Sequence, residues 1–161
     1  MSAKLTPEAM AKSGSEFGEQ GALFCWANSA PVRQKFPDFY NTETKRCKMY
    51  ATNQNFVDAV KGARAKQIGI QSGVADIFIP LARHGMHGLY VELKIDPDHP
   101  QNQRVGKTGE PIAPKRGRAS EEQTSFAKQV RADGYGWAIA EGWKQASDII
   151  SLYLTDLSDS Y

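Results

Sequence analysis

Two short apolar segments, each with an acidic residue inside it, constrain the fold of this chain more than any other feature. Residues 74–79 and 88–94 are rich in β-branched and aromatic side chains and are bounded by Gly or Pro, which is typical of buried strands. The first segment contains Asp76, and the second ends in Glu-Leu-Lys at positions 92–94. Because residues 81–87 form a short connector, we expect two neighbouring strands joined as a hairpin.

The carboxylates in these strands need a compensating charge. An ionised carboxylate among apolar neighbours is costly unless a cation or a metal lies beside it. Because alternate side chains share one face of a strand, Glu92 and Lys94 point the same way. Mg²⁺ is often held by one or two carboxylates together with water and phosphate, so Asp76, Glu92 and Lys94 indicate a divalent-metal site with a cation beside it. A salt bridge at a strand end is the alternative, since a Glu-x-Lys pair alone is common by chance.

Length and composition indicate one folded domain. A chain of 161 residues is long enough to build its own hydrophobic core, and we expect a loose segment at residues 1–12 followed by a single domain at residues 13–161. The near-neutral net charge of +2 says little about partners. There is no stretch of membrane-spanning length and no apolar signal core at the N-terminus. We therefore expect a cytoplasmic protein that needs neither a membrane nor an organic cofactor.

Helical and strand patterns alternate along the rest of the chain, which predicts an α/β fold. Ser120 and Gln123 have the spacing of a capping box, as do Ser13 and Glu16. Residues 96–118 are rich in Pro and Gly and are predicted to form a loop. The predicted helices lie at residues 13–27, 55–66, 120–133 and 142–154, and a third strand lies at residues 137–140.

The first predicted helix presents polar side chains as well as an apolar side that includes Phe17 and Phe24. Glu16 and Gln20 are four residues apart and share a face, so they would add a third carboxylate and an amide to the metal site, with Glu19 as the alternative acid. Acidic residues in a first helical turn are also favoured by the helix dipole. A solvated turn without a catalytic role therefore remains the alternative.

Basic residues gather in the predicted loop and just before the first strand. Glu110 is the only acidic residue among residues 101–118. A flexible basic segment near a metal site suits a phosphate backbone, whose contacts dominate the affinity for nucleic acid; a solvated loop is the alternative. The candidates for nucleic-acid contact are Arg64, Lys66, Arg104, Lys107, Lys115, Arg116 and Arg118.

Taken in order, these motifs resemble the VRR-NUC branch of the PD-(D/E)xK nucleases, in the stand-alone form typical of bacteriophages. The chain departs from the family pattern at Ala75, where the first motif usually has proline; proline supplies no ligand, so the chemistry is unaffected. Residues 52–55 replace a usual Pro-Asn-Gly, and the loop at 96–118 is longer than expected. The motifs that carry the resemblance are residues 15–26, residues 73–80, residues 88–94, Ser120 with Gln123, Gly134-Tyr135 and residues 142–154.

The resemblance implies a restriction-endonuclease-like core, in which a mixed central β-sheet has helices on both faces. It also implies a Mg²⁺-dependent endonuclease that hydrolyses phosphodiester bonds of DNA, with Mn²⁺ as a substitute. Stand-alone members resemble junction-resolving enzymes, so branched DNA such as a four-way junction is the implied substrate. Symmetric cutting of a junction requires two active sites, which predicts a homodimer, and a phage-encoded protein would act in a bacterial host.

The family roles carry over to particular residues of this sequence. Asp76, Glu92 and Glu16 would hold the metal, and Lys94 would orient the attacking water. Gln20 would flank the catalytic centre, and Gln123 would lie beside it in contact with nucleic acid.

Two other classes of function remain open. One is a DNA-binding module of the same fold that cleaves weakly or not at all, although the presence of Asp76, Glu92 and Lys94 together favours an enzyme. The other is an unrelated metal hydrolase that acts on a small phosphorylated substrate. Binding to DNA that weakens steeply with salt would separate a DNA enzyme from the second class.

Overall fold

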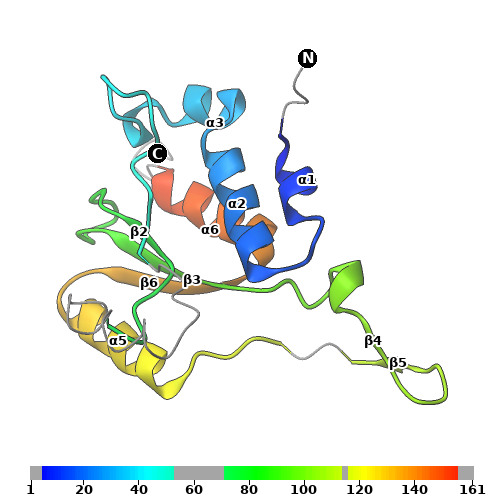
Figure 1. The fold of residues 1–161 in the computed structure, drawn as a ribbon. Coiled ribbons are helices and arrows are strands. Elements are labelled where there is room, and N and C mark those ends of the chain that lie inside the picture. The colour runs from blue at the N-terminus through cyan, green and yellow to red at the C-terminus, as the bar shows by residue number, and fades with distance from the viewer. Residues whose placement is uncertain (1–4, 53–70, 114–115, 156–161) are drawn as a thin grey trace, which may run out of the picture.

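A mixed β-sheet runs through the centre of the protein (Figure 1). The computed structural model describes residues 5–52, 71–113 and 116–155. Within these residues the sheet has the order β1-β2-β3-β6, where β1 and β2 and likewise β2 and β3 are antiparallel and β6 is parallel to β3. The strands are β1 (Tyr50–Ala51), β2 (Ile77–Ile79), β3 (Leu89–Lys94) and β6 (Gly136–Glu141). The predicted hairpin of the two acidic strands is thus confirmed.

Helices cover both faces of the sheet. The helices α2 (Glu16–Ala27) and α6 (Gly142–Leu154) pack together on one face, and α5 (Glu121–Ala132) lies against the other (Figure 1). Leu23 of α2 and Ile150 of α6 are fully buried in the core on the first face. The core therefore sits between the sheet and the α2–α6 pair.

Alternation along β3 sorts its side chains between these two layers. Leu89, Val91 and Leu93 belong to the core on the α2–α6 side. Tyr90 points to the other side, where its ring lies 5.1 Å from the ring of Phe126 in α5. Because Glu92 and Lys94 alternate in the same way, they also face the α5 side.

Several elements differ from the sequence-based expectations. The segment before residue 13, expected to be loose, contains α1 (Pro7–Ala11), which is capped by Thr6 and packs on α2. The chain then forms α3 (Ala30–Lys35) and the 3₁₀ helix η1 (Pro37–Phe39). The helix predicted at residues 55–66 lies outside the described residues.

The N-cap of α2 differs by two residues from the predicted one. Ser15, not Ser13, is the cap, and its hydroxyl accepts the N–H of Gly18. The hydroxyl of Ser13 is hydrogen-bonded to that of Ser15 instead, so the predicted capping box of Ser13 and Glu16 is wrong.

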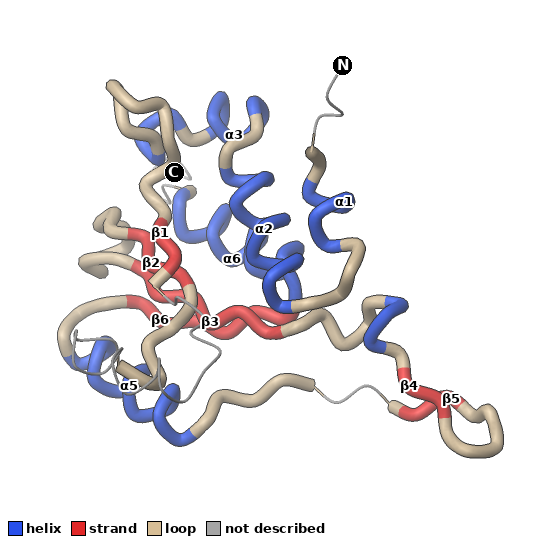
Figure 2. The backbone as a smooth tube through the Cα atoms, in the orientation of Figure 1, coloured by secondary structure: helices blue, strands red, loops and turns tan. Residues whose placement is uncertain are grey.

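The predicted loop at residues 96–118 was expected to be irregular throughout, and this is wrong. It contains the 3₁₀ helix η2 (Pro100–Asn102) and the strands β4 (Arg104–Val105) and β5 (Pro111–Ile112), which pair as an antiparallel hairpin (Figure 2). Gly109, at φ +86°, lies in the turn between them, where a residue without Cβ meets no steric penalty.

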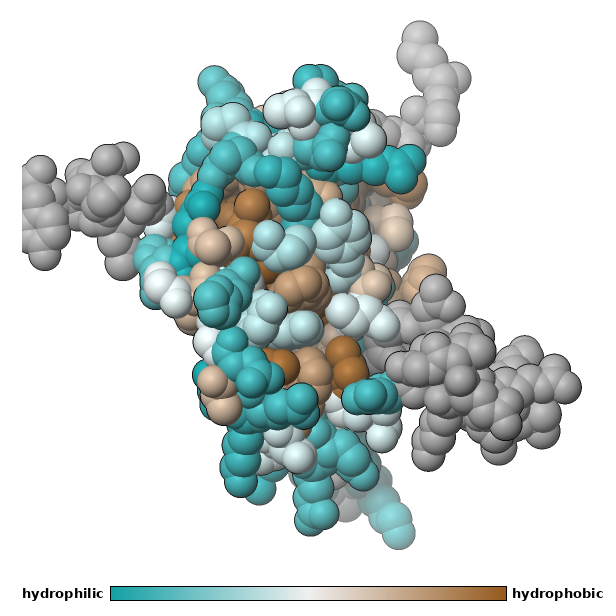
Figure 3. All heavy atoms as spheres, turned by 90° about the vertical axis from the view of Figure 1, so that its left-hand side faces the viewer, coloured by the Kyte–Doolittle hydropathy of each residue, from teal (hydrophilic) through white to brown (hydrophobic). Residues whose placement is uncertain are grey.

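The opposite end of the molecule from this hairpin is mainly hydrophilic, with apolar residues showing between the polar ones (Figure 3). Among the described residues, no helix combines the length and the apolar character needed to cross a membrane.

Gly73 is expected to be far less replaceable than Gly85, although both have a positive φ. A Cβ at Gly73 would lie 2.6 Å from the backbone carbonyl carbon of Glu122, whereas a Cβ at Gly85 meets nothing within 4 Å. Gly85→Ala should cost about 1–2 kcal/mol of unfolding free energy for its backbone conformation alone. Gly73→Ala should cost about 1–3 kcal/mol more because of the clash. Urea denaturation of both variants tests this, and equal losses would contradict the packing described.

Candidate active site

Asp76 and Glu92 are brought together by the pairing of β2 with β3. Ile77 pairs with Val91, so the next residues outward along the two chains are Asp76 and Glu92. Oδ2 of Asp76 accepts a hydrogen bond of 2.9 Å from the backbone N–H of Leu93. Asp76 is 6% exposed and Glu92 is 1% exposed, so both carboxylates lie in the protein interior at the end of the sheet.

Lys94 and Gln123 complete a hydrogen-bonded cluster around Glu92. Nζ of Lys94 donates to Oε1 of Glu92 at 2.8 Å and to Oε1 of Gln123 at 3.2 Å. Nε2 of Gln123 donates to the same oxygen of Glu92. The side chain of Lys94 is 19% exposed and that of Glu92 is 2% exposed, so the ammonium group is the more accessible member of the pair.

Gln123 reaches the cluster because it belongs to the cap of α5. Its N–H donates to Oγ of Ser120 at 3.2 Å, and its Oε1 accepts the N–H of Ser120 at 2.8 Å, which confirms the predicted capping box. The sequence predicted Gln123 as a contact for nucleic acid. In the structure its amide is hydrogen-bonded to Glu92, Lys94 and Ser120, so the side chain holds the carboxylate and the ammonium in place. Contact of Gln123 with nucleic acid stays a prediction.

Glu92 is the most strongly perturbed acid in the cluster. Burial raises the pKa of Glu92 to about 7; the hydrogen bond from Lys94 opposes this rise, and the negative charge of Asp76 adds to it. Oε2 of Glu92 is buried and has no hydrogen-bond partner among the described residues. A buried carboxylate oxygen without a donor is costly when ionised, and a bound cation would remove that cost.

The raised pKa of Glu92 predicts how the metal-free protein responds to pH. The pKa is about 7 in the folded protein against an ordinary 4.5, so folding favours the protonated form, and stability is lost as pH rises from about 4.5 through 7. Glu92→Gln removes this loss. At pH 8 in chelator we expect the variant to be more stable than the wild type by about 2–4 kcal/mol. Denaturation at pH 5 and pH 8 tests this, because a stability difference that does not grow with pH would contradict it.

Glu16 and Gln20 lie at the start of α2, beside the cluster. Partial burial and the charge of Asp76 raise the pKa of Glu16, and the charge of Lys94 lowers it. These interactions place Glu16 on the side of α2 that faces the two strands. Gln20 is half-buried one helical turn further along.

Glu19, the alternative to Glu16, serves a different purpose. It is 1% exposed, and its Oε2 accepts a hydrogen bond of 2.8 Å from the backbone N–H of Trp143 in the first turn of α6. Burial raises the pKa of Glu19, and the hydrogen bond from Trp143 opposes this. Glu19 thus joins α2 to α6, and Glu16 is the helix-borne acid near the cluster.

The donor set fits a cation held by two carboxylates. Within residues 5–52, 71–113 and 116–155, no group of three or more His, Cys, Asp or Glu side chains is arranged to hold a metal ion. Glu16 as a third metal ligand beside Asp76 and Glu92 therefore stays a prediction. Two carboxylates nevertheless suit Mg²⁺, which commonly keeps several waters and takes further oxygens from a phosphate. The unpartnered Oε2 of Glu92 fits such a ligand.

Four of the seven predicted basic contacts lie among the described residues, and they form two groups. Arg116 and Arg118 flank Gly117, which packs so closely on Lys94 that a Cβ there would lie 2.7 Å from Cγ of the lysine. Arg116 also forms a salt bridge with Glu141. The remaining described candidates, Arg104 and Lys107, are exposed on the β4–β5 hairpin, and Arg64, Lys66 and Lys115 lie outside the described residues.

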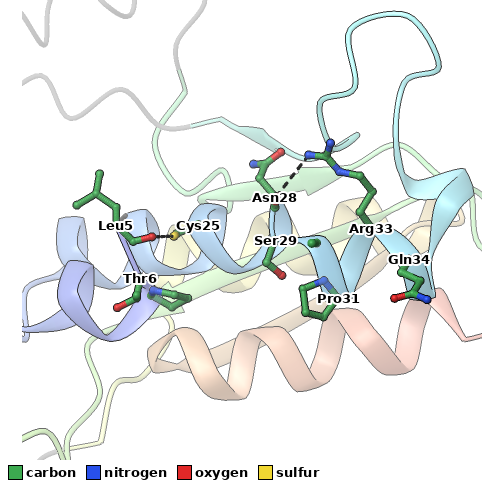
Figure 4. A pocket seen from close by; sticks show the side chains of 10 residues that line it. Leu5, Thr6, Cys25, Asn28, Ser29, Pro31, Arg33 and Gln34 are labelled. Carbon is green, nitrogen blue, oxygen red and sulfur yellow. Dashed lines mark hydrogen bonds between the residues drawn. The ribbon is translucent and has the colours of Figure 1, made fainter. Parts of the chain in front are cut away.

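A hollow of about 950 Å³ lies at the other end of α2, between the segment at residues 5–7 and α3 (Figure 4). The thiol of Cys25 donates to the carbonyl oxygen of Leu5 at 3.2 Å, and Arg33 donates to the carbonyl oxygen of Asn28 at 3.4 Å. Among the described residues that line this hollow, none has a carboxylate or an imidazole. It therefore offers none of the acid–lysine chemistry found at the end of the sheet.

Comparison with known proteins identifies the fold. No family model matches the sequence, and no curated protein matches it. The structure matches a solved structure named VRR_NUC domain protein with a TM-score of 0.58, over 88% of this chain and 90% of that one, at 19% sequence identity. At this identity the likeness is one of fold. The chain thus has the mixed α/β, restriction-endonuclease-like fold predicted from its motifs, and the predicted resemblance to the VRR-NUC family agrees with this neighbour.

Proposed function

We propose that the protein is a metal-dependent endonuclease that hydrolyses phosphodiester bonds of DNA. The observation that carries the proposal is the placement of Asp76, Glu92 and Lys94 in one cluster, with the lysine ammonium 2.8 Å from Oε1 of Glu92. The fold shared with a VRR_NUC domain protein supports the same conclusion.

Asp76 and Glu92 would hold a divalent cation, with Mg²⁺ as the expected ion and Mn²⁺ as a substitute. A bound Mg²⁺ would neutralise charge on the phosphate and lower the pKa of a bound water. The pKa of Glu92 near 7 means that this carboxylate is ionised mainly above neutral pH in the absence of metal. Metal binding is therefore expected to release a proton near neutral pH.

Lys94 would act on the attacking water and on the phosphate. Its ammonium has three donors, of which one is used by Glu92 and one by Gln123. The third donor has no hydrogen-bond partner among the described residues and would orient a water molecule or stabilise charge that develops on a phosphate oxygen. Gln123 would position Lys94 through the hydrogen bond between them, and Glu16 would add negative charge near the cluster.

Branched DNA is the proposed substrate class, and a homodimer is the proposed form for symmetric cutting of a four-way junction. Arg116 and Arg118, on either side of the glycine that covers Lys94, would contact phosphates next to the cleaved bond. Such contacts give affinity that falls with salt.

Cleavage of a matched DNA panel tests the proposal. Purified protein with Mg²⁺ or Mn²⁺ is offered a linear duplex, a flap and a four-way junction of the same flanking sequence. We expect cleavage that chelator abolishes, with the branched substrates cut faster than the linear one. Binding of all three substrates without cleavage would contradict the proposal and favour a binding module of the same fold. Turnover of a small chromogenic phosphodiester without DNA binding would favour an unrelated hydrolase.

A further inference from the structure

The β4–β5 hairpin, residues 104–112, stands away from the layered body of the protein (Figures 1 and 2). Val105 is 70% exposed and Ile112 is 40% exposed. A hairpin of two strands is at best marginally stable in water when it buries no apolar face. The exposed apolar side chains therefore indicate that a partner completes the packing of the hairpin.

The hairpin is tied to the candidate active site on both sides. Before it, Nδ2 of Asn102 donates to the carbonyl oxygens of Asp96 at 2.8 Å and of Gly14 at 2.9 Å, next to the start of α2. After it, Gly117 packs on Lys94. The hairpin is therefore joined at both of its ends to segments that lie beside the candidate active site, so a long partner bound at that site could extend to the hairpin.

The net positive charge of the hairpin favours a polyanionic partner. Arg104 and Lys107 are exposed, and neither forms a salt bridge with a described residue. The acid of the hairpin, Glu110, accepts a hydrogen bond from the hydroxyl of Thr108 and packs over the turn at Gly106. The hairpin therefore carries two positive charges and one negative charge, which leaves it with a net charge of +1.

A two-stranded hairpin can enter a DNA groove. The major groove of B-DNA, about 12 Å wide, admits a two-stranded β-ribbon. Arg104 pairs with Ile112, and Val105 pairs with Pro111, so each face of the ribbon carries an apolar side chain. Such side chains make contacts with thymine methyl groups, while the basic ones reach phosphates on the groove walls.

We infer that the β4–β5 hairpin enters the major groove of the bound DNA beside the bond that is cleaved, with Arg104 and Lys107 on phosphates and Val105 against the base edges. This inference rests on the proposed function, because it requires DNA at the active site. It assigns the hairpin a role in binding DNA and none in the chemical step.

The test measures DNA binding by fluorescence anisotropy in chelator, where the substrate stays intact. Arg104→Ala and Lys107→Ala should each weaken binding severalfold and lower the salt slope by about one. Val105→Ser should weaken binding about fivefold to tenfold with an unchanged salt slope. The matched controls are Leu152→Ser, a 67% exposed leucine on α6, and Lys45→Ala, an exposed lysine before β1; both should bind within about twofold of the wild type. Because all these side chains are exposed, the variants should fold normally.

Ligands that occupy only one groove of DNA show which groove the hairpin enters. Methyl green, which occupies the major groove, should weaken binding of the wild type and have little effect on a variant that combines Arg104→Ala, Val105→Ser and Lys107→Ala. Competition by the minor-groove ligand distamycin alone would overturn the inference.

Suppose that the wild type cleaves DNA and that the hairpin variants bind DNA as tightly as the wild type does. This result would overturn the inference and leave the proposed function standing. A wild type that binds no DNA would overturn both. A change in sedimentation of Val105→Ser with unchanged DNA affinity would assign the hairpin to a second copy of the chain, which also overturns the inference.

Discussion

Glu92→Gln is expected to lower metal-dependent DNA cleavage by about a thousandfold or more. A neutral amide is a poor ligand for Mg²⁺, and the metal supplies several kcal/mol of transition-state stabilisation, where each 1.36 kcal/mol corresponds to about tenfold in rate. The affinity for Mn²⁺, measured by calorimetry, should fall in parallel. DNA affinity should be unchanged or higher, because the substitution removes a negative charge near the phosphate.

The stability of Glu92→Gln, compared with that of the wild type, distinguishes a loss of metal-dependent chemistry from a failure to fold. The same substitution is expected to stabilise the metal-free protein above pH 7, because the pKa of Glu92 is raised by burial. A variant that is more stable than the wild type and no longer cleaves cannot be explained by unfolding. Glu121→Gln, at an exposed acid in the first turn of α5, is the matched control and should cleave normally. Cleavage by Glu92→Gln within about threefold of the wild-type rate would contradict the assignment of Glu92 as a metal ligand.

Lys94→Ala is expected to slow cleavage by about a hundredfold to a thousandfold, the usual cost of removing one donor to developing charge. The metal should still bind, because Asp76 and Glu92 remain. Lys94 lowers the pKa of Glu92, so that pKa will rise further in the variant. The affinity for Mn²⁺ is therefore best compared above pH 8, where Glu92 is more fully ionised.

Lys94→Ala is expected to lower the rate of the chemical step without lowering the affinity for metal. Single-turnover cleavage at saturating metal measures the chemical step, and calorimetry measures the metal. Lys128→Ala, which removes an exposed lysine of α5, should change neither. If Lys94→Ala cleaves at the wild-type rate once metal is saturating, the lysine has only a structural role beside Glu92.

The acidic strands were predictable because their signals are local. Gly and Pro bound the two apolar segments, and the short connector leaves the chain little choice except an antiparallel pair. The period of two along a strand then puts Glu92 and Lys94 on one face. For the same reason the Ser120–Gln123 cap could be predicted, since both partners lie within one helical turn.

The buried face of α2 could not be predicted from local sequence. Apolar periodicity assigned Phe17 to the buried side, yet Phe17 is 77% exposed and Glu19 is 1% exposed. Glu19 tolerates burial because the N–H of Trp143, 124 residues away in sequence, donates to it. A hydrogen bond to a residue so distant in sequence cannot be inferred from the apolar periodicity of a single helix.

The place of Gln123 and the β4–β5 hairpin also depend on tertiary contacts. Gln123 meets Glu92 only after α5 has packed on the sheet, so the family resemblance, and not the capping motif, placed it beside the catalytic centre. The β4–β5 hairpin has two residues in each strand, too few for an alternating pattern to emerge from a basic, Gly-rich segment.

Conversion of supercoiled plasmid DNA by the wild type and by Glu92→Gln tests the central claim most directly. The account predicts that the wild type with Mg²⁺ or Mn²⁺ produces nicked and linear plasmid, that chelator prevents this, and that Glu92→Gln leaves the plasmid supercoiled while still shifting it on a gel. A wild type that shifts the plasmid on a gel but leaves it supercoiled with either metal would contradict the account.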